Sequence, residues 1–261
     1  MSRPNRQKVD LTARKIDRAF AFIKDMKYNE ALKLLSEAEE AAEESGDPGS
    51  MYDAFFTKGS FLQALRFYSE ALPYYEKAAG VGEEMLKNSP ENLDSWVRAV
   101  AVNTNLGALQ RQMGQQEKAR EPFERALELM QHILEKEPEN PGYRKQYGMI
   151  LNNLGNLYTS FEEYEKAEES FGRALETYGK LFIKEPENSS YLYYLGTAYM
   201  NLGVMLEKTG RREEAGVNME KALEIREKLH EIEPENPEYA KDLEVTREKL
   251  NKLKEKGVQE E

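Results

Sequence analysis

Three asparagines carry the most regular polar pattern in this chain. Asn105, Asn153 and Asn201 are 48 residues apart, and each precedes a glycine by two positions. A side-chain amide offers both a hydrogen-bond donor and an acceptor, so it can pair with a peptide backbone whatever the peptide's sequence. Asn is not favoured inside helices, so three copies in register require a reason. The alternative is that these amides bond to one another, or to backbone carbonyls of adjacent helices, and hold the helices together.

Groups that could perform catalysis are scarce. The two histidines, His132 and His230, stand among charged residues and have no evident partners for a metal site or an acid–base pair. Glutamate pairs at 162–163 and 168–169 fit an outer, charged helix face. The chain has no cysteine, which excludes disulfides and thiolate metal sites. We therefore expect no enzymatic activity, no metal site and no cofactor.

Charge and hydropathy argue against nucleic acid and membrane as partners. The 261 residues include 48 acidic and 37 basic side chains, which gives a net charge of −11, whereas phosphate binding needs clustered Lys and Arg. One basic segment, residues 1–28, has eight Lys and Arg against three Asp, and we interpret it as a helix face that complements acidic neighbours. No segment reaches the roughly 18 apolar residues of a membrane span. Because cysteine is absent and the first residues lack a signal-like apolar segment, we expect a cytoplasmic location.

The chain repeats itself every 48 residues. A glycine, an alanine and a proline keep this step through four successive units. They are Gly59, Gly107, Gly155 and Gly203, then Ala71, Ala119, Ala167 and Ala215, then Pro90, Pro138, Pro186 and Pro234. An earlier, irregular unit shows the same internal spacings at Ala19, Ala31, Leu35 and Ala38. Periods of this size are typical of solenoid proteins.

Each unit has the pattern of two antiparallel helices. Between Leu151 and Leu175, apolar residues recur three and four positions apart, as on one face of a helix. One break separates two such runs. A second break lies at SPEN or EPEN, where Pro cannot continue a helix and Asn can cap the next one. Gly in mid-helix costs about 1 kcal/mol relative to Ala, so small Gly155 and Ala167 indicate that the paired helices approach closely there.

These motifs resemble the tetratricopeptide repeat, whose pattern is W-x2-L-G-x2-Y, then A-x3-F, a small residue and Pro. The best match carries Leu154-Gly155, Tyr158, Ala167, Phe171, Ala174 and Pro186. Other units depart from the pattern, with Gln110 in place of the Tyr and Lys58 in place of the Leu. The period exceeds the family's roughly 34 residues by about seven residues in each helix. Seven residues are almost two helical turns, so we predict unchanged faces on helices of about 20 residues.

The resemblance implies that the first helix of each pair lines a concave groove and that the second forms the outside. The candidate groove residues are Thr104, Asn105, Arg111, Met149, Asn152, Asn153, Asn156, Tyr194, Met200 and Asn201. Tyr194 stays open between groove and core, and Arg111 and Asn156 favour an acidic or polar ligand. Family members that clamp a peptide carboxylate use Lys and Asn in these helices. Because the Lys is missing here, the sequence does not support such a clamp.

We predict an all-α fold, a right-handed α-solenoid of five antiparallel helix pairs with a capping helix, similar to a TPR superhelix. Residues 1–47 would form an irregular pair, and residues 48–89, 90–137, 138–185 and 186–234 would form four elongated repeats. Residues 235–256 would form a polar capping helix, and 257–261 a disordered tail.

The predicted function is a non-catalytic protein-interaction scaffold that binds a peptide or a helix of a partner protein in its groove. The alternative is a structural solenoid that associates with itself, without a dedicated peptide ligand. An exposed apolar end or patch would favour this alternative.

Overall fold

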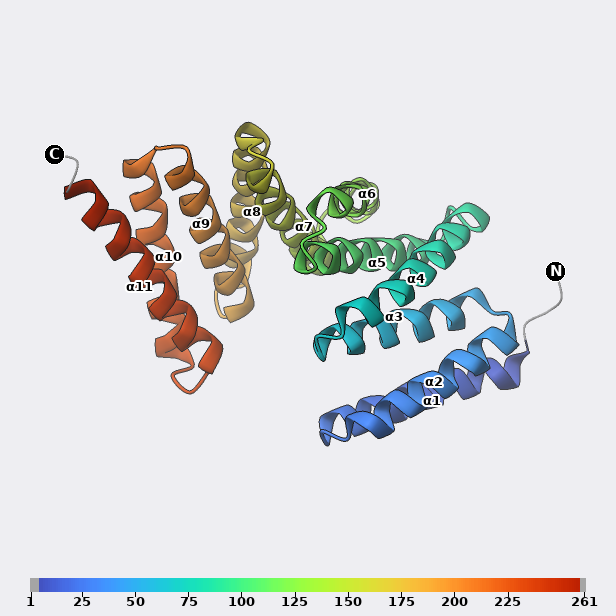
Figure 1. Ribbon diagram of the computed structural model, residues 1–261. Helices are drawn as coiled ribbons and strands as arrows, with labels where there is room; N and C mark the ends of the chain where they lie inside the picture. Colours follow the sequence, from blue (N-terminus) through green and yellow to red (C-terminus); the bar gives the residue numbers. More distant parts are fainter. Residues whose placement is uncertain (1–4, 259–261) are drawn as a thin grey trace. The chain divides into compact units, whose positions relative to one another are not determined.

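All regular structure in the described chain is helical. The computed structural model describes residues 5–258, with side chains as far as residue 255. That range contains no strand, and Figure 1 shows helix following helix along the chain. The helices are α1 (Arg6–Lys24), α2 (Tyr28–Ser45), α3 (Pro48–Ala64), α4 (Tyr68–Asn88), α5 (Leu93–Gln112), α6 (Gln116–Lys136), α7 (Pro141–Ser160), α8 (Tyr164–Lys184), α9 (Ser189–Lys208), α10 (Arg212–Ile232) and α11 (Pro237–Val258). The predicted all-α class is confirmed.

Helix length agrees with the elongated repeat. Helices α5, α7 and α9 have 20 residues each, and α4, α6, α8 and α10 have 21 each. At 1.5 Å per residue, such helices are about 30 Å long. The prediction of about 20 residues per helix is therefore confirmed. The predicted tail at 257–261 overlaps the end of α11, and residues 259–261 lie outside the described residues.

Asparagine side chains begin several of the first helices. Asn92, Asn140 and Asn188 accept hydrogen bonds from the backbone N–H groups of residues 94, 142 and 190 at 3.1, 3.0 and 3.2 Å. These N–H groups have no acceptor within their own helix, so the caps satisfy them. The Asn of the SPEN and EPEN linkers therefore has the predicted capping role.

The turns inside the pairs close on a left-handed residue. Gly114 and Gly210 have φ values of 74° and 79°, and Arg66 and Glu162 take the same conformation at 64° and 60°. Left-handed backbone is strained for residues with a Cβ, by roughly 1–2 kcal/mol. The α3–α4 turn at Arg66 and the α7–α8 turn at Glu162 therefore accept this strain, because their sequences have no glycine there.

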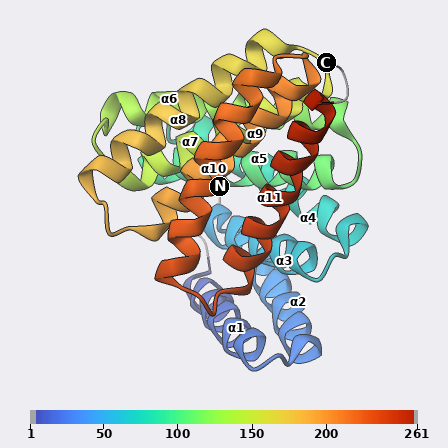
Figure 2. The ribbon, with the colours of Figure 1, turned by 90° about the vertical axis from the view of Figure 1, so that its left-hand side faces the viewer.

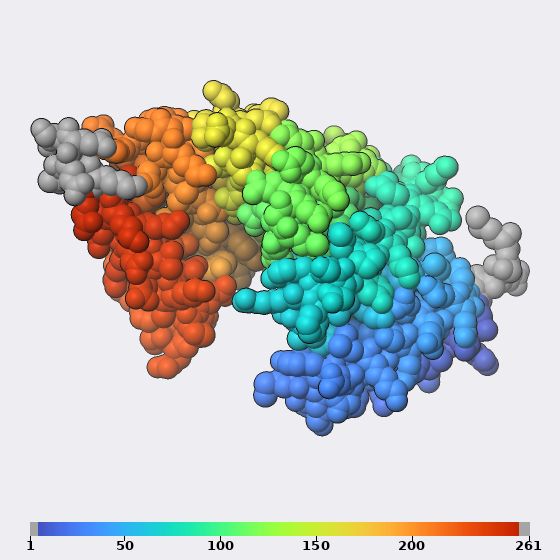
Figure 3. All heavy atoms as spheres, in the orientation of Figure 1, coloured from blue at the N-terminus to red at the C-terminus, as the bar shows by residue number. Residues whose placement is uncertain are grey.

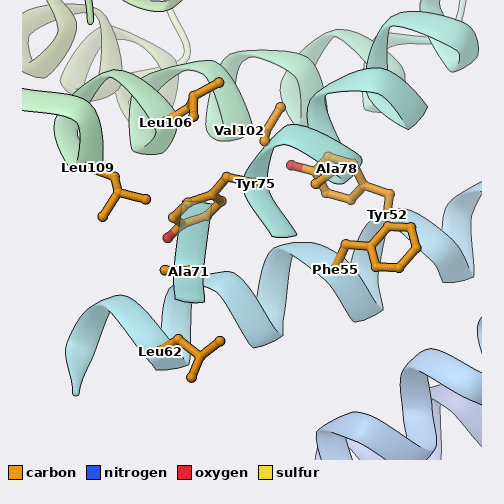
Figure 4. Packing of buried hydrophobic residues seen from close by; sticks show 9 residues of the cluster. All are labelled: Tyr52, Phe55, Leu62, Ala71, Tyr75, Ala78, Val102, Leu106 and Leu109. Carbon is orange, nitrogen blue, oxygen red and sulfur yellow. The ribbon is translucent and has the colours of Figure 1, made fainter. Parts of the chain in front are cut away.

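The chain divides into two compact units, an N-terminal unit up to Leu129 and a C-terminal unit from Met130 onward. In the N-terminal unit, α1 packs against α2, α3 packs against α4, and α4 also packs against α5. Tyr75 of α4 is fully buried between α3 and α5, and its hydroxyl is hydrogen-bonded to Ser60 (3.0 Å) and Gln63 (2.7 Å) of α3. Figure 4 shows the surrounding cluster of Tyr52, Phe55, Leu62, Ala71, Ala78, Val102, Leu106 and Leu109.

In the C-terminal unit the helices from α7 to α11 pack one against the next. Figure 2 shows α10 and α11 side by side, and Figure 3 shows their side chains in contact, in orange and red. The apolar stripe of α11 is buried at Leu243, Leu250 and Leu253. Arg226 of α10 is also buried, and it donates to the Asp242 carbonyl oxygen at 2.9 Å and to the Thr246 hydroxyl of α11. These contacts hold α11 on the end of the unit.

Glycines mark the closest approaches within the pairs. A Cβ placed on Gly155 would lie 2.6 Å from the ring of Phe171, a distance that real Cβ contacts essentially never show. The corresponding distances at Gly107 and Gly203 are 2.9 and 2.8 Å, to side chains of α6 and α10. The predicted close approach is confirmed at all three glycines.

Two further glycines have the same role, although the repeat pattern does not single them out. A Cβ on Gly148 would lie 2.6 Å from Tyr178, and one on Gly196 would lie 2.9 Å from Ile225. Both glycines lie seven residues before the repeated glycine of their own helix. Each elongated pair α7/α8 and α9/α10 therefore has two close contacts, two helical turns apart.

Candidate binding surfaces

Asn105 lies in the N-terminal unit and has a partner inside its own unit. Its side chain, half-buried on α5, is hydrogen-bonded to the Tyr75 hydroxyl of α4. Burial raises the pKa of Tyr75, and the hydrogen bonds with Ser60 and Asn105 act in the opposite direction. This amide therefore helps to satisfy a buried phenol.

The amides of the C-terminal unit have different surroundings. Asn201 of α9 donates a hydrogen bond of 3.1 Å to the side-chain oxygen of Asn152 of α7. Asn153 and Asn156 are half-buried on α7 and make no side-chain hydrogen bond to the described residues. The structure thus joins Asn201 to Asn152, a neighbour of Asn153 in the chain. We call Asn152, Asn153, Asn156 and Asn201 the amide face.

Thr104 and Arg111 of α5 differ in how their polar groups are satisfied. The Thr104 hydroxyl donates to the Val100 carbonyl of its own helix at 2.8 Å. Arg111 is half-buried, burial lowers its pKa, and its Nε is buried without a hydrogen-bond partner. An acidic group on a bound molecule would complete the bonding of this arginine.

The apolar candidates lie closer to the core than to an open surface. Met200 is buried, and Met149 is half-buried. Tyr194 stacks on the buried ring of Tyr178 at 5.4 Å and meets Tyr193 edge-on at 5.5 Å. The Tyr193 hydroxyl is 3.0 Å from a side-chain oxygen of Glu238 in α11, and burial raises the pKa of Tyr193. The tyrosines therefore brace α8, α9 and α11.

First helices in the N-terminal unit are also bridged by polar contacts. Asp53 of α3 pairs with Arg98 of α5, and Gln63 of α3 donates to Gln112 of α5 at 2.9 Å. The repeat pattern of the sequence does not indicate that Gln63 and Gln112 meet. These pairs join residues 45 and 49 positions apart, close to one repeat period.

The histidines do not form a metal site. His132 Nδ1 is 3.6 Å from a carboxylate oxygen of Glu135, and His230 Nδ1 is buried without a partner. Among residues 5–258 no group of three or more His, Asp or Glu side chains is arranged to hold a metal ion. Within the same residues, every helix is too short or too polar to span a membrane.

Each unit has a cavity between its described helices. One in the C-terminal unit, of about 300 Å³, is lined by cations that already have partners: Arg144 with Glu139, Arg173 with Tyr147 and Lys180 with Glu176. The other, in the N-terminal unit, is about 580 Å³ and is lined by two buried amides, Asn103 and Gln110. The departure at Gln110 and its spacing of seven residues from Asn103 are visible in the sequence, but the cavity that both line is formed only by packing.

Stacked pairs of antiparallel helices with a repeated small-residue contact define an α-solenoid. Sequence models of the tetratricopeptide repeat match residues 100–130, 148–182 and 195–238. The chain is a tetratricopeptide repeat protein, with repeats of 48 residues. A search of curated proteins finds no match.

Solved structures with the same fold share little sequence with this chain. RapI in its apo form is 19% identical with a TM-score of 0.66, covering 83% of this chain and 70% of RapI. BtubC from P. vanneervenii is 19% identical with a TM-score of 0.54, covering 86% and 92%. A Signal Transduction ATPase with Numerous Domains from Pyrococcus horikoshii, which has a tetratricopeptide repeat sensor, is 19% identical with a TM-score of 0.63. That match covers 94% of this chain and 35% of the larger protein. A fold of this kind is in general a non-catalytic scaffold for protein interaction.

Proposed function

We propose that the chain is a non-catalytic scaffold that holds an extended segment of a partner protein on the amide face of its C-terminal unit. The observation that carries this proposal is the hydrogen bond between Asn201 and Asn152, which joins amides of two different first helices. Asn153 and Asn156 lie beside this pair on α7, half-buried and without side-chain bonds to the described residues.

The remaining bonding capacity of these amides suits a peptide backbone. The bond between Asn201 and Asn152 uses one N–H donor and one lone pair, so each amide keeps further donor and acceptor capacity. Neighbouring helices pack about 8–10 Å apart, and an extended peptide rises about 3.3 Å per residue. One amide could therefore meet roughly every third residue of a strand-like segment.

The test uses peptides selected from a random display library on the intact protein. Binding of a selected peptide is measured by calorimetry to the wild type and to Asn153→Ala/Asn156→Ala. Loss of two hydrogen bonds of about 1 kcal/mol each weakens binding by roughly thirtyfold. The matched control is Asn218→Ala on α10, whose amide bonds to the Glu214 carbonyl of its own helix. Equal affinity for the wild type and the double variant, with circular dichroism unchanged, contradicts the proposal.

A second candidate function, self-association, is favoured by exposed apolar side chains in the N-terminal unit. Phe20 and Met26, at the end of α1 and the turn after it, are 54% and 75% exposed, and Phe67 in the turn before α4 is 48% exposed. Exposed apolar side chains are a common basis for contact between copies where they gather in one patch. Sedimentation velocity tests it: a wild-type dimer that Phe20→Ser/Met26→Ser converts to a monomer supports self-association, and a monomeric wild type excludes it.

A further inference from the structure

Helix α5 carries two buried amides where the other first helices carry large apolar side chains. Asn103 lies four residues before the repeated glycine, and Gln110 lies three after it. At the first position α3, α7 and α9 have Phe55, Leu151 and Tyr199, and at the second they have Leu62, Tyr158 and Leu206. Asn103 and Gln110 are each only 7% exposed. The spacing of seven residues puts both on the same side of α5.

One of the two amides is not fully satisfied within the described protein. Asn103 donates its amide N–H to the Ala99 carbonyl at 2.8 Å. The side-chain oxygen of Gln110 is buried with no hydrogen-bond partner. A buried polar group without a partner destabilises a fold, whereas the apolar residues of the sister helices do not. The unpartnered oxygen of Gln110 therefore needs an explanation that packing within the described protein does not supply.

Both amides line one cavity of about 580 Å³ between α4, α5 and the first half of α6. Its apolar lining comes from Ala79, Leu106 and Pro122. Its charged lining is balanced, with Lys118 and Arg125 against Glu83 and Glu121. Arg125 and Glu83 form a two-pronged ion pair, with both N···O distances at 3.0 Å.

We propose that this cavity is a recognition pocket for a carboxamide side chain, Asn or Gln, of a bound polypeptide. The Gln110 side-chain oxygen, which lacks a partner, can accept an N–H of one ligand carboxamide, and the Gln110 amide nitrogen can donate to the oxygen of that ligand. A carboxylate ligand offers no N–H for the Gln110 oxygen, and the balanced charges supply no excess cation for it. An aliphatic ligand leaves the Gln110 oxygen without a donor. The site uses residues of the N-terminal unit and is independent of the amide face of α7 and α9.

The experiment is an NMR titration of the full chain with three capped amino acids. The probes are the N-acetyl methylamides of glutamine, leucine and glutamate, which differ only in the side-chain end. The proposal predicts saturable shifts of the Asn103 and Gln110 side-chain N–H₂ signals with the glutamine probe. It predicts binding at least tenfold weaker for the other two. Equal binding of the leucine or glutamate probe, or no saturable shift with the glutamine probe, overturns it.

A grafted variant separates recognition from stability. Asn103→Leu/Gln110→Tyr installs the pair that α7 carries at these positions. It should abolish the NMR shifts that the glutamine probe causes at Leu106 and Ala79, which also line the cavity. The melting temperature should stay equal or rise, because two buried amides are removed. If the graft fails to fold, Gln110→Met, which keeps the side-chain length, is tested in its place. The matched control Gln112→Leu changes an exposed amide of the same helix and should leave the response intact. A graft or Gln110→Met variant that still binds the glutamine probe like the wild type overturns the proposal.

Discussion

The α3/α4 pair and the α7/α8 pair carry the same repeat motif, but different interactions are made at its residues. In α7, Leu154 is fully buried, and Gly155 lets the Phe171 ring approach to within 2.6 Å of where a Cβ would be. In α3 the residues two periods earlier are Lys58 and Gly59. At Gly59 the same distance is 3.3 Å, which an added methyl group nearly tolerates.

In the α3/α4 pair, the lysine at this position instead forms a nearly buried ion pair with the neighbouring helix α2. Lys58 Nζ is 2.7 Å from a Glu39 carboxylate oxygen and 3.0 Å from the Ser36 hydroxyl, both on α2. It also lies 4.6 Å from the centre of the Tyr74 ring, and Lys77 reaches the other Glu39 oxygen at 3.0 Å. A single position of the repeat can therefore serve apolar packing in one pair and charge pairing in another.

The largest effect is expected from Glu39→Ala. This change leaves Lys58 buried without its carboxylate, and breaking a buried pair costs about 3 kcal/mol or more. The free energy of unfolding, measured by urea titration, should fall by about that amount. A loss no greater than that of Glu40→Ala, an exposed neighbour on α2, would show that the pair does not hold α2 to α3.

Substitution of the repeated glycines should give the next largest effect, and its size should differ between the two pairs. Gly155→Ala should destabilise by roughly 1–3 kcal/mol, because the Phe171 ring must move out of a packed core. Gly59→Ala should be close to neutral, because the gain of about 1 kcal/mol in helix propensity offsets a tight contact. Thermal unfolding of the two variants measures this difference. Equal melting temperatures would show that the two pairs do not differ in how closely their helices approach at the glycine.

Acid should weaken the α2–α3 contact more than the α7/α8 contact. Burial acts to raise the pKa of Glu39, but hydrogen bonds from Lys58 and Lys77 outweigh it and hold the pKa below its usual 4.5. A carboxyl whose folded-state pKa is depressed contributes stability above its unfolded-state pKa and loses it as the pH falls through the folded-state pKa. The urea midpoint is measured at a pH above the unfolded-state pKa of Glu39 and at a pH below its folded-state pKa. The fall of the midpoint between these two pH values should be smaller for Glu39→Gln than for the wild type. Parallel falls in both proteins would contradict the assignment.

The smallest effect is expected from Lys58→Leu, which restores the residue type of the repeat motif. Glu39 keeps Lys77 as a partner at 3.0 Å, so no charge is left unpaired, and an apolar replacement of a buried ion often costs little. The free energy of unfolding should change by less than about 1 kcal/mol. A loss as large as that of Glu39→Ala would mean that the lysine itself holds the contact.

Local rules were enough to predict the helix pairs, but not the partners of the amides. The spacing of Gly107, Gly155 and Gly203 predicted close approach, because a glycine in mid-helix must be compensated by packing. The same regularity did not distinguish Asn105, which bonds to Tyr75, from Asn201, which bonds to Asn152. These partners lie 30 and 49 positions away in the chain, so identical spacing along the sequence does not imply identical surroundings.

The sequence by itself determined the helix pairs, their length of about 20 residues and the family, because each depends on interactions within three or four residues or on a repeated local pattern. Only the tertiary structure decided where Lys58 finds its carboxylate and that Asn103 and Gln110 line one cavity. It also revealed the close contacts at Gly148 and Gly196. The physical reason is that these features depend on which side chains of neighbouring helices meet, and that choice is made by packing across the pairs.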